Sequence, residues 1–480
     1  MVTETQLEAV KNPKLTLIAF QLRNTLLSGD EPIKTSDHLW EKCRELGIKL
    51  GSPQLKDLIK QLQKPDGKIG FASTDDNPDS DHIPLLKPDP DTFLYFYGKP
   101  GANYPQIQGG VYPLQIHDTY AVDITFYRPE AVVKVSELHQ FLNPNYCLMP
   151  DFIQSDLGQT LLFFAEPMAV ENKSDRHFIN ACIRGLFPPA EAELLLKHPP
   201  GEGQLFGSPI FEYQTPKIHL LIWLNNSPQT QQLESQGKYY QPLINLLCCR
   251  HKILYAYHQS RWCYQQAKQL YQQLSPHLQI IQGLPEPTQQ KLEILKDELT
   301  KLPGLSFEYF SYIQQIKIHL NTIETNLKNY QTCVKDLENI ALSEDNLPFL
   351  QKFQATARTT FIEQIEVDLE YLIPVQDLFS ELINTIRGLV EIEQTECDRS
   401  LEHTIQILGA GLGAGGIVAS AVSGHIEQGF LVKDDQNQYI LNPGIYALFW
   451  SLFVFLLVGG VVGSINGGLI EWYNNYLKKR

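Results

Sequence analysis

Acidic side chains provide the clearest candidates for chemistry in this sequence. Glu391, Glu396 and Glu402 belong to a run of carboxylates that directly precedes a long segment without charges. Repeated around the axis of a symmetric oligomer, these carboxylates would form rings that concentrate cations at the mouth of a pore. In a monomer they would be a solvated face of a helix. The neighbouring Arg387 and Arg399 favour this second interpretation, because they neutralise part of the negative charge.

The segments after these carboxylates are rich in glycine at four-residue steps. Helices in a bilayer cannot associate through the hydrophobic effect, so small residues that let two backbones approach closely take over that role. The pattern therefore predicts close packing of two membrane helices within one chain, or assembly of an oligomer around an axis. A hydrophobic hairpin in water is the third alternative. The expected packing residues are Gly409, Gly413, Gly415, Gly459, Gly463 and Gly467.

The histidines and cysteines give no complete catalytic or metal-binding pattern. Cys248 and His251 come nearest, because a spacing of three residues places both on one face of a helix. Zinc usually needs three or four ligands, so a buried helical pair of cysteines, Cys248 and Cys249, is the favoured interpretation. The sequence also has no Walker A, nucleophile-elbow or protein-kinase motif. We therefore predict no enzyme activity and no cofactor, with a divalent cation as the one ligand left open.

A second weak metal signal lies in a segment rich in Asp, Pro and Ser. Asp75, Asn77 and Asp79 have the every-second-residue spacing of a calcium-binding loop. Ser80 and Leu86 stand where such a loop requires glycine and glutamate. An acidic linker exposed to solvent is therefore the favoured interpretation of this segment.

Composition limits the partners of this chain of 480 residues. Its formal net charge of −15 argues against a nucleic-acid-binding surface, so no nucleic acid is expected as a partner. The eight cysteines are scattered, which fits a reducing cytosol better than a disulfide framework. The first residues show no apolar core after a basic start, so no cleaved signal peptide is expected.

Two windows near the end of the chain, 404–426 and 436–470, contain no Asp, Glu, Lys or Arg. A helix needs about 20 apolar residues to cross a bilayer, so each window predicts a transmembrane helix. Positive charges favour the cytoplasmic side, which places both termini in the cytoplasm and the protein in a cell membrane of the inner or plasma type. The predicted parts are transmembrane helices at 404–425 and 443–470, an outer loop at 426–442 and a basic cytosolic tail at 471–480.

The larger, polar part of the chain changes its pattern several times. Short amphipathic stretches come first, then apolar runs with the punctuation of strands, and finally long stretches with helical periodicity. The expected parts are a small helical module at 1–63, an acidic linker at 64–91, a mixed α+β domain at 92–230 and a long-helix bundle and stalk at 231–403. The expected fold class is an α+β cytosolic domain followed by an antiparallel long-helix bundle and stalk and two C-terminal transmembrane helices.

Prolines subdivide the expected bundle. Pro276 and Pro303 predict breaks between its helices, and Pro374 predicts a kink or the start of the stalk. After Pro374, apolar residues recur at three- and four-residue steps as far as Val390, which predicts one apolar stripe. The stalk is expected to continue into the first predicted membrane helix, because no turn signal separates the two.

The order of these parts resembles the layout of the CorA-type magnesium transporter superfamily over residues 230–480. That resemblance implies a homopentamer in which the first membrane helix lines the pore and a Gly-Met-Asn signature closes its outer end. The chain departs from the family there, because its methionines are Met1, Met149 and Met168 and the corresponding stretch reads Ser-Gly-His-Ile at 423–426. No site residue of the family can therefore be carried over.

These patterns predict a two-pass integral membrane protein with a large cytosolic domain, acting as an oligomeric CorA-like cation channel gated by that domain. The expected partners are the lipid bilayer and further copies of the chain. The alternative is a membrane-anchored sensor or interaction scaffold without transport activity, in which the 92–230 domain binds the ligand. An enzyme built on that domain is a third hypothesis.

Overall fold

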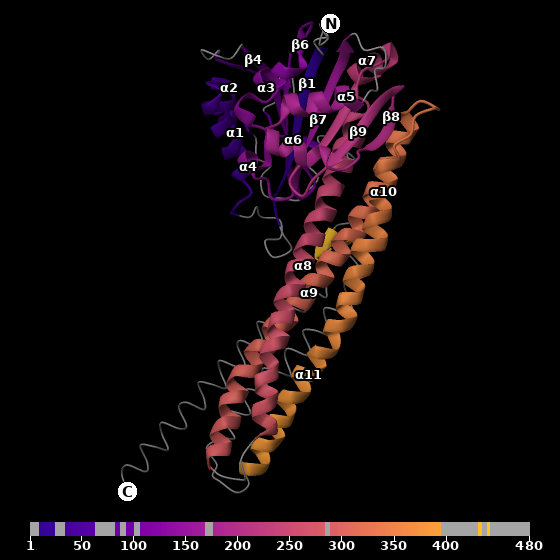
Figure 1. The fold of residues 1–480 in the computed structure, drawn as a ribbon. Coiled ribbons are helices and arrows are strands. Elements are labelled where there is room, and N and C mark those ends of the chain that lie inside the picture. The colour runs from indigo at the N-terminus through magenta and orange to yellow at the C-terminus, as the bar shows by residue number, and fades with distance from the viewer. Residues whose placement is uncertain are drawn as a thin grey trace, which may run out of the picture. The chain divides into compact units, whose positions relative to one another are not determined.

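The computed structural model describes residues 9–24, 34–62, 82–86, 93–99, 106–168, 176–283, 289–394, 431–433 and 439–441. Their elements form two compact units (Figure 1). The described parts of Met1–Cys263 and Gln315–Leu369 make the first unit, and those of Tyr264–Gln314 and Glu370–Arg480 make the second. The expected domain of mixed helices and strands, followed by long helices, is confirmed, and the long helices contribute segments to both units.

The first unit is built on a ten-stranded sheet. Its strands follow the order β2-β4-β5-β1-β7-β10-β9-β8, with β3 paired to β4 and β6 paired to β1. All pairs are antiparallel except β7 and β10, which run parallel. The strands are β1 (Ala9–Leu22), β2 (His82–Pro84), β3 (Leu94–Gly98), β4 (Ile107–Ile116), β5 (Thr119–Tyr127), β6 (Val132–Lys134), β7 (Gly158–Met168), β8 (Gly201–Leu205), β9 (Ser208–Gln214) and β10 (His219–Leu224).

Strand β1 corrects the prediction of a small helical module at 1–63. Residues Ala9–Leu22 pair with β5 on one side and with β7 on the other, so β1 is an inner strand of the sheet (Figure 1). Leu17 and Ile18 are both buried, because each face of this strand is covered. A strand buried on both faces loses its polar alternation, and its apolar run can be mistaken for a helix. The helices α1 (His38–Lys49) and α2 (Pro53–Lys56) are helical as expected.

One face of the sheet packs against short helices. Alternate residues of the inner strands point to this face, among them Leu17, Ile124, Phe163 and Ile222, and they share a buried core with Trp40 of α1. Burying each such side chain contributes about 1.5–3 kcal/mol, so this core is the main source of stability for the unit. The other helices of this core are α2, α3 (Leu138–Leu142), α4 (Pro150–Ile153), α5 (Arg176–Leu186) and α6 (Pro189–Leu196).

The long helices are less interrupted than the sequence predicts. Pro276 lies inside α8 (Tyr240–Gln282) and Pro303 lies inside α9 (Gln289–Ile340), so the breaks expected at these prolines are wrong. A proline removes one backbone hydrogen bond from the helix. A long helix can continue without that bond when the helices packed against it hold the segments before and after the proline in place. Helix α10 (Pro348–Thr356) passes through a π-helical turn, η4 (Ala357–Ile362), directly into α11 (Glu363–Gln394).

The second unit contains segments of α8, α9 and α11 that lie side by side (Figure 1). The hydroxyl of Tyr309 on α9 donates a hydrogen bond to the carbonyl oxygen of Leu372 on α11, at 2.8 Å. The ring of Tyr309 also packs against Phe379, with 5.3 Å between the ring centroids. His277 and Glu298 form a hydrogen bond that joins α8 to α9. These contacts agree with the expected long-helix bundle.

None of the helices in the described ranges has both the length and the apolar character needed to cross a membrane. This finding contradicts the function expected from the sequence, a two-pass membrane protein acting as a CorA-like cation channel or as an anchored scaffold, and that function is withdrawn. Charged side chains explain the finding for α11, whose first turn already contains Glu363 and Glu366. The predicted membrane helices at 404–425 and 443–470 lie outside the described residues.

Most of the predicted packing and pore residues also lie outside the described residues. They are Gly409, Gly413, Gly415, Gly459, Gly463, Gly467, Glu396 and Glu402. Glu391 is described: it lies on α11, 3.5 Å from Arg387, in an ion pair between two partly exposed side chains. This contact agrees with a solvated helix face. The predicted outer loop at 426–442 includes a short hairpin of β11 (Leu431–Lys433) and β12 (Tyr439–Leu441).

Two helical glycines give a matched test of the packing. A Cβ atom at Gly185 of α5 would lie 2.0 Å from the carbonyl oxygen of Val135, whereas one at Gly388 of α11 would have no heavy atom within 4 Å. We expect Gly185→Ala to destabilise the first unit by about 1–3 kcal/mol or more, because backbone must move. Gly388→Ala should stabilise α11 by up to about 1 kcal/mol. Thermal unfolding followed by circular dichroism measures both, and equal effects would contradict this account of the α5 packing.

Candidate functional site

Helix α8 covers the second face of the sheet with one stripe of side chains. Tyr240, Leu243, Leu247 and Arg250 are three or four residues apart, so all of them project from one side of the helix. They meet alternate residues of the strands, such as Leu162 of β7, whose neighbours point to the opposite face. The stripe is apolar in its middle and polar at its two ends.

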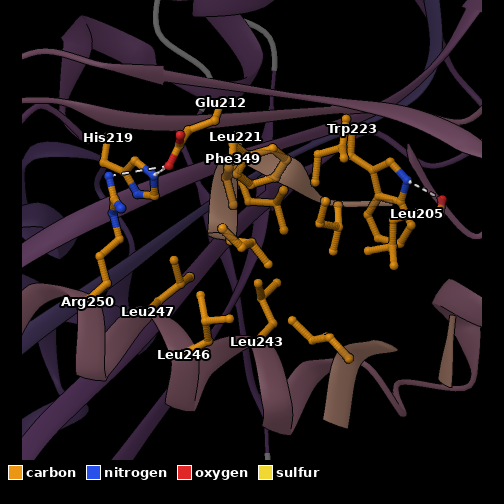
Figure 2. Close-up of a pocket in the computed structure, with 15 residues that line it drawn as sticks. Leu205, Glu212, His219, Leu221, Trp223, Leu243, Leu246, Leu247, Arg250 and Phe349 are labelled. Atoms are coloured by element: carbon orange, nitrogen blue, oxygen red, sulfur yellow. Dashed lines mark hydrogen bonds and ion pairs between the residues drawn. The ribbon is translucent and has the colours of Figure 1, made fainter. Parts of the chain in front are cut away.

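Leucines of α8 fill the middle of this interface (Figure 2). Leu243, Leu246 and Leu247 point toward Leu221 and Trp223 of β10 around an apolar cavity of only about 20 Å³. The indole of Trp223 donates a hydrogen bond to the carbonyl oxygen of Leu205, at 3.2 Å. This part of the interface is core packing, and it separates two polar regions.

The first polar region is a buried chain of hydrogen bonds. The Thr160 hydroxyl lies 2.8 Å from Nδ1 of His219 and 2.8 Å from Nε2 of His251. Nε2 of His219 lies 3.1 Å from a carboxylate oxygen of Glu212, which is also 3.3 Å from Arg250 (Figure 2). Three residues from three strands and two from α8 therefore form one connected network.

The pKa shifts of these groups determine which group donates and which accepts in each hydrogen bond of the network. Burial lowers the pKa of His219 to about 4, and burial also holds the pKa of His251 well below its ordinary value. Burial alone would raise the pKa of Glu212, but the His219 hydrogen bond and the Arg250 charge outweigh it and keep the pKa low. Near neutral pH both imidazoles therefore carry one N–H each. His219 then donates to Glu212, Thr160 donates to His219, and His251 donates to Thr160.

The order Thr160, His219, Glu212 resembles a nucleophile, a base and an acid, but the geometry excludes that role for Thr160. Its side chain is fully buried and borders none of the three cavities described in this section and below. Its hydroxyl is also held between two imidazoles, so no lone pair is directed at a substrate. The network instead fixes the ionised Glu212 carboxylate and its partner Arg250 in position.

The second polar region surrounds a cavity of about 370 Å³ at the other end of the stripe. Asp123 of β5 lies at its floor and is 3% exposed. The hydroxyl of Thr125 donates a hydrogen bond to Asp123 at 2.8 Å, and Thr16 of β1 lies 2.8 Å from Thr125. Since Thr125 gives its proton to the carboxylate, Thr16 is the donor in the second bond.

Burial raises the pKa of Asp123 to about 6, and hydrogen bonding from Thr125 opposes part of this rise. The Tyr240 hydroxyl also favours the ionised carboxylate. However, the geometry between the two groups falls short of a hydrogen bond, and within the described residues that buried hydroxyl has no partner. The carboxyl group is therefore poised to change its protonation close to neutral pH, and to accept a further donor.

Aromatic rings and one ion pair complete this cavity. Lys14 of β1 and Glu234 of α7 (Pro228–Ser235) form an ion pair at 2.9 Å, so each neutralises the other. Tyr95 is 51% exposed, which places it at the rim. The aromatic residues of the lining are Phe93, Tyr95, Tyr127, Tyr239 and Tyr240.

The sequence singled out different residues. Cys248 and His251 both lie on α8 as predicted, but His251 bonds to Thr160, and burial raises the pKa of the Cys248 thiol. In the part of the chain that is described, no group of three or more His, Cys, Asp and Glu side chains is arranged to hold a metal ion. Asp123 and His219, which sequence reasoning missed, share one signal: each is a polar residue of an otherwise apolar strand, Asp123 within β5 and His219 at the start of β10.

Comparison with known proteins adds no assignment, since no family model, no curated protein and no solved structure matches this chain. The resemblance of residues 230–480 to the CorA-type layout therefore stays a prediction, as does an oligomeric assembly.

Replacement of Thr160 tests the hydrogen-bond network. Thr160→Val keeps the shape but removes the hydroxyl, which leaves two buried imidazoles without their partner. We expect a loss of roughly 2–4 kcal/mol in the free energy of unfolding. Thr160→Ser keeps the hydroxyl and should lose only about 1 kcal/mol, for the missing methyl group. Chemical denaturation compares the two variants, and a serine variant as unstable as the valine variant would refute the network.

Proposed function

We propose that the protein binds a small organic cation in the Asp123 cavity. The observation that carries the proposal is a buried carboxylate without a positive partner, at the floor of a cavity lined by aromatic rings. This combination provides both of the interactions that proteins use to recognise ammonium groups. The chain is then a ligand-binding protein whose binding domain is the first unit.

The charges in the cavity support a cationic ligand. Asp123 makes no ion pair with any Lys, Arg or His of the described residues, and no positive charge contributes to its pKa. Lys14 is already paired with Glu234 and leaves the cavity with one unbalanced carboxylate. Keeping a charge buried without a partner is costly, and such groups cluster at functional sites. An ammonium group would supply the missing partner.

The rings support an ammonium group in particular. An aromatic face attracts a cation by about 0.5–2 kcal/mol, and several rings around one site add their attraction. Tyr95 on β3, Tyr127 on β5 and Tyr240 on α8 approach the cavity from three separate elements. Rings on separate elements can surround a ligand, whereas rings on one strand would form only a flat surface.

Choline and its uncharged analogue 3,3-dimethylbutan-1-ol provide a matched pair of probes, since they share one shape and differ in charge. Isothermal titration calorimetry on the full chain should show saturable choline binding and about tenfold weaker binding of the alcohol. Asp123→Asn should reduce choline binding to the level of the alcohol. Equal affinity for the two probes, or unchanged choline binding by the variant, would count against the proposal.

The affinity should depend on pH in a defined direction. A bound cation favours the ionised form of Asp123, so binding must release the proton that the free carboxyl group holds below its pKa of about 6. Choline affinity should therefore rise as the pH rises through about 6 and become constant above it. Calorimetry in buffers of different ionisation enthalpy measures the released proton. Affinity that falls over the same range would contradict the role of Asp123.

Asp123 should also cost stability when it is ionised. Its pKa is raised from 3.8 to about 6, so its contribution to folding is most favourable below pH 3.8 and is lost as the pH rises through 6. Asp123→Asn does not titrate and can still accept the Thr125 bond. The free energy of unfolding of this variant, relative to that of the natural chain, should therefore be about 3 kcal/mol higher at alkaline pH than at acid pH. Urea denaturation at both pH values checks the gain, and a constant difference would disprove it.

A further inference from the structure

The first unit has another cavity near the opposite end of the α8 stripe, and the proposed function does not use it. Its volume is about 470 Å³. Strands β8 and β9, the end of α6, helix α8 and the segment from α10 into η4 form its walls. The lining residues that carry the argument are Glu212, Arg250, Lys352, Phe353 and Phe361.

Arg250 is 1% exposed and uses only part of its hydrogen-bonding capacity. Its Nη2 atom donates to the Gln214 side chain at 2.5 Å and lies 3.3 Å from Glu212. Its Nε and Nη1 atoms have no hydrogen-bond partner among the described residues. Each buried donor left unpaired costs about 1–3 kcal/mol, and a guanidinium cannot lose its charge to avoid this cost. A ligand with acceptor oxygens would remove it.

The charges around Arg250 favour an anion. The carboxylate of Glu212 is already committed to His219 and Arg250, and its low pKa keeps it ionised in that role. Lys352 adds a second positive charge to the cavity, and its field also helps to hold the pKa of Glu212 low. Lys352 is exposed and forms no ion pair within the described part of the chain. Glu202 also lines the cavity, but it is paired with Arg176 at 2.6 Å, so one positive charge is left for a ligand.

Flat apolar surfaces lie beside these charges. The ring of Phe353 is 4.1 Å from the guanidinium carbon of Arg250, so the cation rests on an aromatic face. Phe361 stacks on Tyr257 with 4.2 Å between centroids and an interplanar angle of 21°. Phe361 belongs to the π-helical turn η4, a rare conformation that often accompanies functional sites.

We propose that this cavity binds a small organic anion, a carboxylate attached to a planar apolar body. Arg250 and Lys352 hold the carboxylate, and the rings of Phe353 and Phe361 pack against the body. The site is separate from the Asp123 cavity, and its lining residues differ from those of that cavity.

The probes for this site are 4-fluorobenzoate and its uncharged counterpart 4-fluorobenzamide. Fluorine NMR with the full chain should show saturable broadening of the benzoate signal and about tenfold weaker binding of the benzamide. Benzamide binding of equal strength would show an apolar pocket without anion recognition. Benzoate that does not bind at millimolar concentration would overturn the proposal as well, with ordered water as the partner of Arg250.

Variants of the lining residues test whether benzoate binds in this cavity. Lys352→Gln changes an exposed residue and should weaken benzoate binding by roughly threefold. Lys328→Gln, at an exposed position of α9 outside the cavity, is the matched control and should have no effect. The double variant Glu212→Gln with Arg250→Gln removes both charges together and should abolish binding. Asp123→Asn should leave it unchanged. Binding that survives both the Lys352 change and the double change would refute the site.

Discussion

The packing of one stripe of α8 across a single face of the sheet is the interaction on which both cavities depend. Leucines in the middle of the stripe bury apolar area, and that burial provides the free energy that holds the two ends in place. Tyr240 and Arg250 lie at these ends because steps of three and four residues carry the stripe from β5 to β9. A rotation of α8 about its axis would disrupt both polar regions at once.

Two buried carboxylates on this face behave in opposite ways. Glu212 has a hydrogen bond from His219 and the Arg250 charge beside it, so its pKa stays low. Asp123 has hydroxyl groups but no cation, so burial decides its pKa. Environments that separate the pKa values of similar groups are typical of functional sites. Here they distinguish Glu212, which positions Arg250, from Asp123, which is available to bind a ligand.

The sequence predicted what depends on local pattern and missed what depends on distant partners. Long stretches with helical periodicity correctly indicated α8, α9 and α11. Strand β1 was missed because burial on both faces hides its alternation. Asp123 stands in an apolar run, and nothing near it in sequence reveals Tyr240 as its neighbour, since the two meet only when α8 packs on the sheet. Hydropathy alone suggested the membrane function that the described helices contradict.

The central place of β1 also affects how the chain can fold during synthesis. β1 leaves the ribosome first, yet one of its neighbours is β7 and the parallel partner of β7 is β10, which ends at Leu224. At about 5–20 residues per second, roughly 10–40 s separate the emergence of the first strand and the last. For the first part of that interval the long apolar segment β1 has no partner on either edge, because β5 must emerge to cover one edge and β7 to cover the other. Such segments are the usual substrates of ribosome-associated chaperones, so the sheet order gives this chain a need for protection early in translation.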